Sequence, residues 1–305
     1  MTYYLLSYER RGLPRAGLLV NDCVYDLADV TGHHEWHSTI DMLKDWAKAQ
    51  AVITGCIGTL PNEGIALDGI KLLAPVLYPG AIYCAGANYV DHVAEMQKAQ
   101  GLPVGPTAKE RGDTAWHFLK TSRGSIIGPN AVAQVPVDIR CLDWEIELAA
   151  VIGKVARNVS ADDALDYVAG YTIANDLSAR DYMKRDKQDS NSPFVYDWIG
   201  QKCFDGACPI GPWIVPTCFL PNAHNLSMKL WVGDELMQDS NTSQLIFSVA
   251  EQIETLSAHR TLYPGDLILT GTPAGVGMGR KRFLQSGESV RLWIEGIGEF
   301  THQIG

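Results

Sequence analysis

The chain has 305 residues, of which 46% are hydrophobic, and carries a formal net charge of -10 at pH 7 with a pI near 5.2. This length buries a substantial core, which we expect to form one large and one small domain, and the acidic balance argues against a nucleic-acid partner. The seven cysteines form no C-x-x-C pair and no apolar run reaches roughly 18 residues, so we expect a cytoplasmic protein with reduced thiols and no membrane segment.

Residues 1–75 are expected to form a small α+β domain. The short apolar runs YYLLSY and RAGLLV predict two strands. The segment TIDMLKDWAKAQAVI repeats its apolar residues at helical spacing, which predicts a helix before the chain reaches Pro75.

From residue 76 onward the pattern changes to short apolar runs separated by glycine and proline. Runs of this kind are typical of strands joined by turns, so we predict a mainly-β domain over residues 76–305. Helical periodicity is limited to three stretches, at about 88–101, 161–168 and 242–259. The whole chain is therefore predicted to be α+β and mainly β.

The predicted helix at 88–101 carries a histidine and a glutamate that can meet. His92 and Glu95 are three residues apart and therefore share one helix face. As a surface feature this is an ordinary ion pair, whereas in a site a carboxylate that orients a histidine makes a general base able to activate water. The polar, Gly- and Pro-rich stretch 101–113 that follows has the composition of a flap over a site.

The segment DWEIELAAVIG places three acids within an apolar strand. Asp143, Glu145 and Glu147 share one face because successive strand side chains alternate. A solvated outer strand would explain them, but the run continues as LAAVIG, apolar on both faces, which indicates a buried strand. Buried carboxylates this close together require partners, and a metal ion is one explanation.

A further acid follows the apolar run YTIAND. Asp176 stands where that strand is expected to end, so it either caps a turn or adds a third oxygen ligand to Glu145 and Glu147. Three carboxylates without histidine or cysteine are the ligands of a hard cation, which favours Mg²⁺, Mn²⁺ or Ca²⁺ over Zn²⁺.

Two later segments contribute candidate polar groups. Lys202 lies in an apolar, Gly- and Pro-punctuated setting, where it either extends to solvent or points inward to bind an anion or stabilise an enolate. The glycine-rich LILTGTPAGVGMG does not match a nucleotide-binding loop. Its Gly271 and Thr272 could instead offer a backbone amide and a hydroxyl to a substrate carboxylate.

Taken in order, the motifs NYVDHVAE, DWEIELAAVIG, NDLSARD, QKCFDGACPIGPWI and LILTGTPAGVG resemble the fumarylacetoacetate hydrolase superfamily. The resemblance covers roughly residues 75–305, and RAGLLVNDCVYDLADV looks like the small N-terminal domain of longer bacterial members. It implies a mixed β-sandwich roll, barrel-like in form, that is usually dimeric.

The same resemblance implies roles for individual residues. His92 and Glu95 match the dyad of a lid helix at about 88–101, and Met183 stands where the family often has glutamine, within an Asp176-to-Lys202 segment longer than in compact members. The implied metal ligands are Glu145, Glu147 and Asp176, and the implied enolate-stabilising cation is Lys202. The implied substrate-binding residues are Arg180, Lys120 and Thr272, and Gly271 joins them through the backbone amide described above.

The expected function is divalent-metal-dependent hydrolysis of a C–C bond in a 2,4-dioxo acid, giving pyruvate and a carboxylic acid. Decarboxylation of oxaloacetate-like acids and isomerisation of 2-hydroxy-dienoates use the same enolate and stay open as alternatives. A non-catalytic binding protein on the same scaffold is disfavoured because all five implied metal and dyad residues are present. The expected cofactor is Mg²⁺ or Mn²⁺, and the expected partners are a small 2-oxo acid and a second copy of the chain.

Overall fold

Most strands belong to one long mixed sheet, part of a computed structural model that describes residues 1–305. At its centre, β11 pairs antiparallel with β12 and β17, whereas β17 pairs parallel with β6. In order of pairing the strands are β4 (Ile65–Ala66), β3 (Cys23–Asp26), β2 (Leu13–Val20), β1 (Tyr4–Arg10), β14 (Cys208–Pro216), β12 (Val168–Asn175), β11 (Ile146–Ile152), β17 (Leu267–Leu269), β6 (Ile82–Ala85) and β7 (His117–Lys120), with β5 (Lys71–Leu73) on β1 and β8 (Ile126–Ile127) on β14.

A second sheet packs against the first and closes the main core. Its strands β15 and β18 alternate buried and half-buried residues, so one face of each points inward. Leu148 of β11, Leu230 of β15 and Leu292 of β18 belong to one hydrophobic cluster between the sheets. The strands are β16 (Glu235–Asn241), β15 (Ser227–Val232), β18 (Ser289–Ile294), β19 (Gly298–Ile304) and β9 (Val132–Ala133), and β10 (Leu142–Asp143) pairs separately with β13 (Ser178–Ala179).

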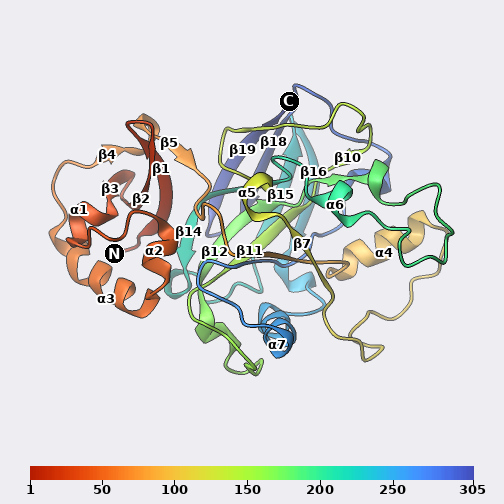
Figure 1. Ribbon diagram of the computed structural model, residues 1–305, viewed down its shortest axis with the longest axis horizontal. Helices are drawn as coiled ribbons and strands as arrows, with labels where there is room; N and C mark the ends of the chain where they lie inside the picture. Colours follow the sequence, from red (N-terminus) through yellow and green to blue (C-terminus); the bar gives the residue numbers. More distant parts are fainter.

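This arrangement confirms the predicted fold class, a mainly-β structure with a roll-like sandwich. The sheets do not close into a barrel. The N-terminal elements lie at one end of the longest axis and α4 at the other (Figure 1). Strand β1 nevertheless pairs with β14, with Leu5 opposite Ile214, so the first 75 residues extend the same sheet. A domain boundary near residue 75 stays a prediction.

The helices follow local capping signals. The predicted helix TIDMLKDWAKAQAVI is divided because Asp45 caps a new helix, and the stretch 161–168 contains a short 3-10 helix rather than an α-helix. None of the helices combines the length and the apolar character that crossing a bilayer requires. The α-helices are α1 (Leu27–Thr31), α2 (Thr39–Leu43), α3 (Trp46–Cys56), α4 (Val90–Ala99), α5 (Ser122–Ser125), α6 (Trp198–Lys202), α7 (Val249–His259) and α8 (Gly277–Arg280).

Candidate active site

Three buried carboxylates meet at the paired ends of β11 and β12. The register sets Ile146 opposite Asn175, so Glu145 and Glu147 flank the position where Asp176 leaves its strand. One carboxylate oxygen from each acid lies within 4.8 Å of the others, and all three side chains are buried. The alternation that placed both glutamates on one face, and the strand end that placed the aspartate, therefore bring the three predicted ligands together.

The backbone of this cluster is held by a buried asparagine. The Glu145 N–H donates to Asn175 Oδ1 at 2.9 Å, and the Asp176 N–H donates to the Glu145 carbonyl at 2.9 Å. The Asn175 amide in turn donates to His302 Nε2 at 2.9 Å, which requires the neutral imidazole to accept there. The buried histidine on β19 thus supports the acid cluster from the second sheet.

This support predicts acid sensitivity. Burial lowers the pKa of His302 to about 4 from 6.5, so in acid the unfolded chain takes up a proton that the folded protein does not, and stability is lost as pH falls below 6.5. As the pH falls from 6.5 to about 5, His302 should therefore lower the free energy of unfolding by about 2 kcal/mol. His302→Gln lacks the titrating group, and its amide oxygen can still accept from Asn175. Urea denaturation at the two pH values should therefore show a loss of unfolding free energy that is smaller in the variant than in the parent by that amount. Equal losses would contradict the assignment.

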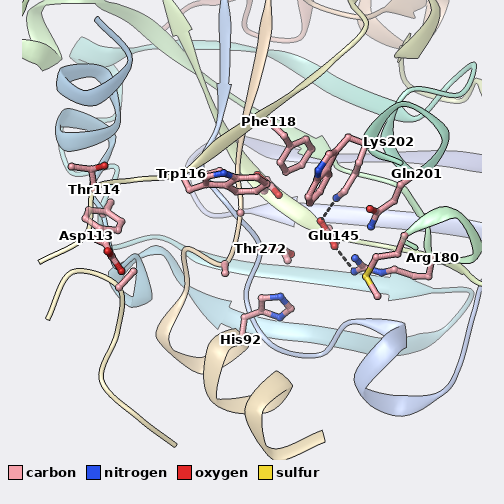
Figure 2. A pocket seen from close by; sticks show the side chains of 18 of the residues that line it. His92, Asp113, Thr114, Trp116, Phe118, Glu145, Arg180, Gln201, Lys202 and Thr272 are labelled. Carbon is pink, nitrogen blue, oxygen red and sulfur yellow. Dashed lines mark hydrogen bonds and ion pairs between the residues drawn. The ribbon is translucent and has the colours of Figure 1, made fainter. Parts of the chain in front are cut away.

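Two cations contact the acids on the side of the cavity that Glu145 and Glu147 line. Lys202 at the end of α6 lies 3.0 Å from Glu145 Oε2 and 2.7 Å from Asp176 Oδ2. Arg180 Nη2 lies 2.5 Å from Glu145 Oε1 and 2.9 Å from Asp143 Oδ2, while Arg180 Nη1 makes no protein hydrogen bond. Figure 2 shows Lys202 and Arg180 converging on Glu145. Both side chains therefore point inward, and Arg180 keeps a free N–H edge.

A third cation lies behind the cluster. Lys120 is fully buried and its ammonium lies 2.7 Å from Asp176 Oδ1. It also donates to the carbonyls of Leu177 at 3.0 Å and Lys202 at 2.7 Å. Two of its N–H donors are thus used by backbone carbonyls, while the contact with Asp176 is an ion pair, because Asp176 Oδ1 accepts no hydrogen bond. The substrate-binding role of Lys120 stays a prediction.

Glu147 is the acid without a cationic partner. Its Oε2 accepts the Gly271 N–H at 2.6 Å, and its other oxygen accepts no hydrogen bond from the protein. Burial, together with the charges of Asp176 and Glu145, raises the pKa of Glu147 well above its usual value. Glu145 shows the opposite balance, because the nearby cations outweigh burial and lower its pKa.

The residues present fit a divalent cation. Four buried carboxylates, Asp143 included, face the three cations Lys120, Arg180 and Lys202, so ionisation of all four leaves one negative charge in excess on the Glu147 side. The ligand set is made of carboxylate oxygens only, the donors that Mg²⁺, Mn²⁺ and Ca²⁺ prefer. A cation beside Glu147 would offset the charge that burial disfavours.

Helix α4 carries the predicted dyad, of which His92 lines a cavity together with Glu145 and Glu147. His92 Nδ1 lies 3.7 Å from Glu95 Oε2, an ion-pair distance rather than a hydrogen bond, and that nitrogen is buried without another partner. Both Glu95 oxygens lie within hydrogen-bond distance of the Gly275 N–H, at 3.0 and 3.1 Å. Asp91 accepts a hydrogen bond from Ser240 Oγ at 2.6 Å, which holds the start of the helix against β16. Burial opposes ionisation of Glu95, but the His92 and Gly275 contacts lower its pKa, so it stays a carboxylate.

A cavity of about 600 Å³ joins these groups. One wall is aromatic, with Trp198 centred 5.1 Å from Trp116 and 5.3 Å from Phe118, and Lys202 Nζ lies 4.8 Å from the Phe118 ring centre. His92 lies on the opposite side of Glu145 from Phe118 (Figure 2). Residues of the predicted flap, Arg111 and Asp113 among them, also line the cavity, but closure of that segment stays a prediction.

Gly271 and Thr272 use their polar groups within the protein. Gly271 has a φ of +102°, which favours glycine, and this conformation directs its N–H to Glu147. The Thr272 hydroxyl donates to the Ile146 carbonyl and accepts from Gln238, both at 2.9 Å. Thr272 also lines the cavity. Their predicted contact with substrate stays a prediction.

Asp143 has a function that its place on the acidic face of the sequence does not predict. Its carboxylate accepts from Arg180 Nε at 3.0 Å and from the N–H groups of Gly277 at 2.6 Å and Met278 at 3.1 Å. Burial raises the pKa of Asp143 despite the opposing charge of Arg180. It therefore holds the guanidinium and the start of α8 in one arrangement. Its spacing of two residues from Glu145 is the feature of the sequence that indicates a place beside the acid cluster.

Loss of this carboxylate should destabilise the protein. Asp143→Asn leaves Arg180 buried with one anionic partner fewer, and breaking a buried pair costs about 3 kcal/mol. The change in unfolding free energy should be measured by urea denaturation, beside the exposed Asp162→Asn, for which we expect a change below about 0.5 kcal/mol. Equal stability of the two variants would show that the pair contributes nothing.

Comparison with known proteins places these features in a family. The Fumarylacetoacetate (FAA) hydrolase C-terminal family matches residues 81–305. A curated relative, oxaloacetate tautomerase fahd2, mitochondrial, from Xenopus laevis, is 39% identical over 244 residues, which cover 79% of this chain and 70% of the relative.

Two solved structures are similar over almost the whole chain. Maleylpyruvate hydrolase from Sphingobium sp. SYK-6, in complex with manganese(II) ion and pyruvate, has a TM-score of 0.75 at 29% identity and covers 99% of this chain and 98% of its own. 5-Carboxymethyl-2-hydroxymuconate delta-isomerase from Mycobacterium smegmatis has a TM-score of 0.72 at 29% identity, with the same coverage. The similar proteins thus include a tautomerase, a hydrolase and an isomerase.

Proposed function

The chain belongs to the fumarylacetoacetate hydrolase family, and from that premise we propose that it hydrolyses a C–C bond of a 2,4-dioxo acid, releasing pyruvate and a carboxylic acid. The observation that carries this proposal is that His92, paired with Glu95, lines one cavity with two acids of the cluster, Glu145 and Glu147, and with the cations Arg180 and Lys202. A base able to activate water thus faces groups able to stabilise an enolate.

In the proposed reaction, the free edge of Arg180 and the ammonium of Lys202 bind the carboxylate and the 2-oxo oxygen of the substrate. His92 accepts a proton from a water molecule, and the Glu95 carboxylate stabilises the imidazolium. The water oxygen bonds to C4, the C3–C4 bond breaks, and its electron pair passes to C3 and the 2-oxo group as an enolate. Return of the proton to C3 yields pyruvate, while C4 leaves as the acid.

The surroundings favour the charge that develops. Lys202 and Arg180 lie where negative charge would accumulate on the 2-oxo oxygen, in a largely buried setting where such attraction is strong. A bound Mg²⁺ or Mn²⁺ would supply Lewis-acid polarisation and a further positive charge, held by Glu145, Glu147 and Asp176. The aromatic wall of Trp116, Phe118 and Trp198 would exclude bulk water on the side away from His92.

Keto–enol tautomerisation of oxaloacetate is the second candidate. It is favoured by the 39% identity to the Xenopus laevis protein of that name. The same residues would serve, since His92 could move the proton between C3 and solvent while Lys202 and Arg180 hold the enolate. Decarboxylation of oxaloacetate and isomerisation of a 2-hydroxy-dienoate require the same enolate.

The test is product analysis. Acylpyruvates and oxaloacetate should be supplied with Mg²⁺ or Mn²⁺ and again after EDTA, while pyruvate, carboxylic acid, CO₂ and enol absorbance are measured. Metal-dependent release of pyruvate with an equal amount of acid would support hydrolysis. Faster decay of enol absorbance from oxaloacetate without either product would support tautomerisation instead, and release of CO₂ would support decarboxylation.

Two further proposals and one prediction concern the protein as a whole. We propose that the chain forms a homodimer, and measurement of its mass in solution by light scattering would test this. The α4 segment is proposed as a lid, and hydrogen exchange with and without pyruvate and Mn²⁺ would test its closure. A cytoplasmic location stays a prediction, because the Xenopus laevis relative is named as mitochondrial; fractionation of the source cells would decide it.

A further inference from the structure

A second cavity, of about 490 Å³, adjoins the acid site. The two cavities share His92, Arg180 and Met183, so they meet at the dyad histidine and the free edge of the guanidinium. His92 and Arg180 both lie below Glu145 in the view of Figure 2. The side chains that give the second cavity its character are His92, Met96, Arg180, Met183, Met278 and Phe283.

Two helices that contact each other, α4 and α8, supply part of the lining of this cavity. His92 and Met96 are one turn apart on α4 and so lie on one face of it. Met278 belongs to α8 on the other side, and the Glu95 contact to the Gly275 N–H holds α4 against the loop that leads into α8. The face of α4 that carries His92 therefore also lines the second cavity through Met96.

Apart from His92 and Arg180, where the two cavities meet, the inner part of this lining is apolar. Three thioethers and a phenyl ring line the interior, and methionines adapt their shape to ligands of differing outline. The polar residues Gln100 and Lys281 are exposed and belong to the outer part of the lining, and no ion pair of Lys281 is present. No carboxylate side chain lines this space.

We propose that this methionine-lined cavity binds the acyl group of the substrate, so that the enzyme acts on acylpyruvates whose acyl group is apolar rather than on dicarboxylic analogues. The inference rests on the proposed hydrolysis. With its carboxylate and 2-oxo oxygen at Arg180 and Lys202, the substrate presents C4 to a water at His92. The substituent on C4 then extends past His92 toward Met96 and Met278, into the second cavity.

The first test measures binding alone. Titration calorimetry with straight-chain 2-oxo acids, from pyruvate to 2-oxooctanoate, should be done with Mg²⁺ present. These acids have no 4-oxo group and cannot be hydrolysed, so affinity is read independently of turnover. Each methylene that enters the cavity should tighten binding about fourfold, the effect of burying one CH₂ group. Affinity independent of chain length would overturn the proposal.

Two variants locate the effect. Met278→Gln places an amide in the apolar wall and should reduce the gain per methylene to below about twofold, whereas Met278→Leu keeps the wall apolar and should retain it. A gain that persists in Met278→Gln would show that the chain binds elsewhere, for instance at the aromatic wall of Trp116, and would overturn the proposal.

A parallel set of acylpyruvates separates this inference from the proposed function. We expect kcat/KM for pyruvate release to rise with acyl length by the same factor, and to fall about tenfold or more when the acyl chain ends in a carboxylate. A chain-length effect on binding without any hydrolysis would support the cavity and reject hydrolysis. Hydrolysis without a chain-length effect would reject the cavity alone, as would a preference for the carboxylate-ended chain.

Discussion

Glu147→Gln is expected to abolish binding of Mg²⁺ or Mn²⁺ and, with it, turnover. Glu147 has a free carboxylate oxygen beside Glu145 and Asp176, and it is the acid of the cluster without a cationic partner. An amide oxygen is a weaker ligand and carries no charge. We expect titration calorimetry to show a loss of metal affinity of more than about 100-fold, the upper end for a supporting residue around a metal.

The same substitution should leave the fold intact. Because burial and two neighbouring carboxylates raise the pKa of Glu147, the ionised side chain is costly in the metal-free protein. A neutral side chain of the same shape removes that cost, so metal-free Glu147→Gln should unfold at a temperature equal to or above that of the parent. Metal should then fail to raise this temperature further, although it does so in the parent.

A control separates the ligand from general charge effects. Glu235→Gln changes an exposed glutamate on β16 that makes no ion pair, and it should leave metal affinity unchanged. Unchanged affinity in Glu147→Gln as well would remove Glu147 from the ligand set. A large fall in the melting temperature of the metal-free variant would instead assign Glu147 a structural role.

Local periodicity was sufficient to predict the central acids. Glu145 and Glu147 lie two apart, so any extended backbone places them on one face, and a strand end fixes where Asp176 emerges. The His92–Glu95 pair likewise follows from helical spacing alone. Patterns of this kind depend on the residues within one element, and tertiary packing preserves them.

Contacts between distant segments could not be predicted in the same way. Lys120 reaches Asp176 because β7 lies at one end of the long sheet and its side chain points inward, and nothing near Lys120 in the sequence distinguishes it from a surface lysine. The support of Asn175 by His302 joins two sheets across 127 positions. Such pairs depend on which strands become neighbours in the fold, and the periodicity of apolar residues does not determine this.

The helix predictions failed where local polar groups competed with periodicity. Asp45 accepts the Lys48 N–H and starts a new helix inside the apolar pattern of TIDMLKDWAKAQAVI. At 161–168, the Ser160 hydroxyl donates to Asp163, and a single 3-10 turn replaces the expected helix before β12 begins. A stretch this short gains too little from propagation to extend further.

His92→Ala is expected to reduce kcat about 1000-fold while metal affinity stays unchanged, because a positioned general base contributes about 100- to 10,000-fold. The same loss is expected for hydrolysis and for tautomerisation, since His92 moves the proton in both. The residue lies outside the Glu145–Glu147–Asp176 cluster, so the metal should still bind. Steady-state kinetics and calorimetry on the same preparation measure the two quantities.

Two variants and one additive make this prediction specific to proton transfer. Added imidazole should restore part of the activity of His92→Ala, and exposed His34→Ala should match the parent. Glu95→Gln can still accept the Gly275 N–H but lacks the charge that stabilises the imidazolium, so kcat should fall about tenfold. Full activity of His92→Ala would remove His92 from the mechanism. A loss of metal affinity in His92→Ala, or failure of imidazole to restore any activity, would assign the histidine to positioning of α4 rather than to proton transfer.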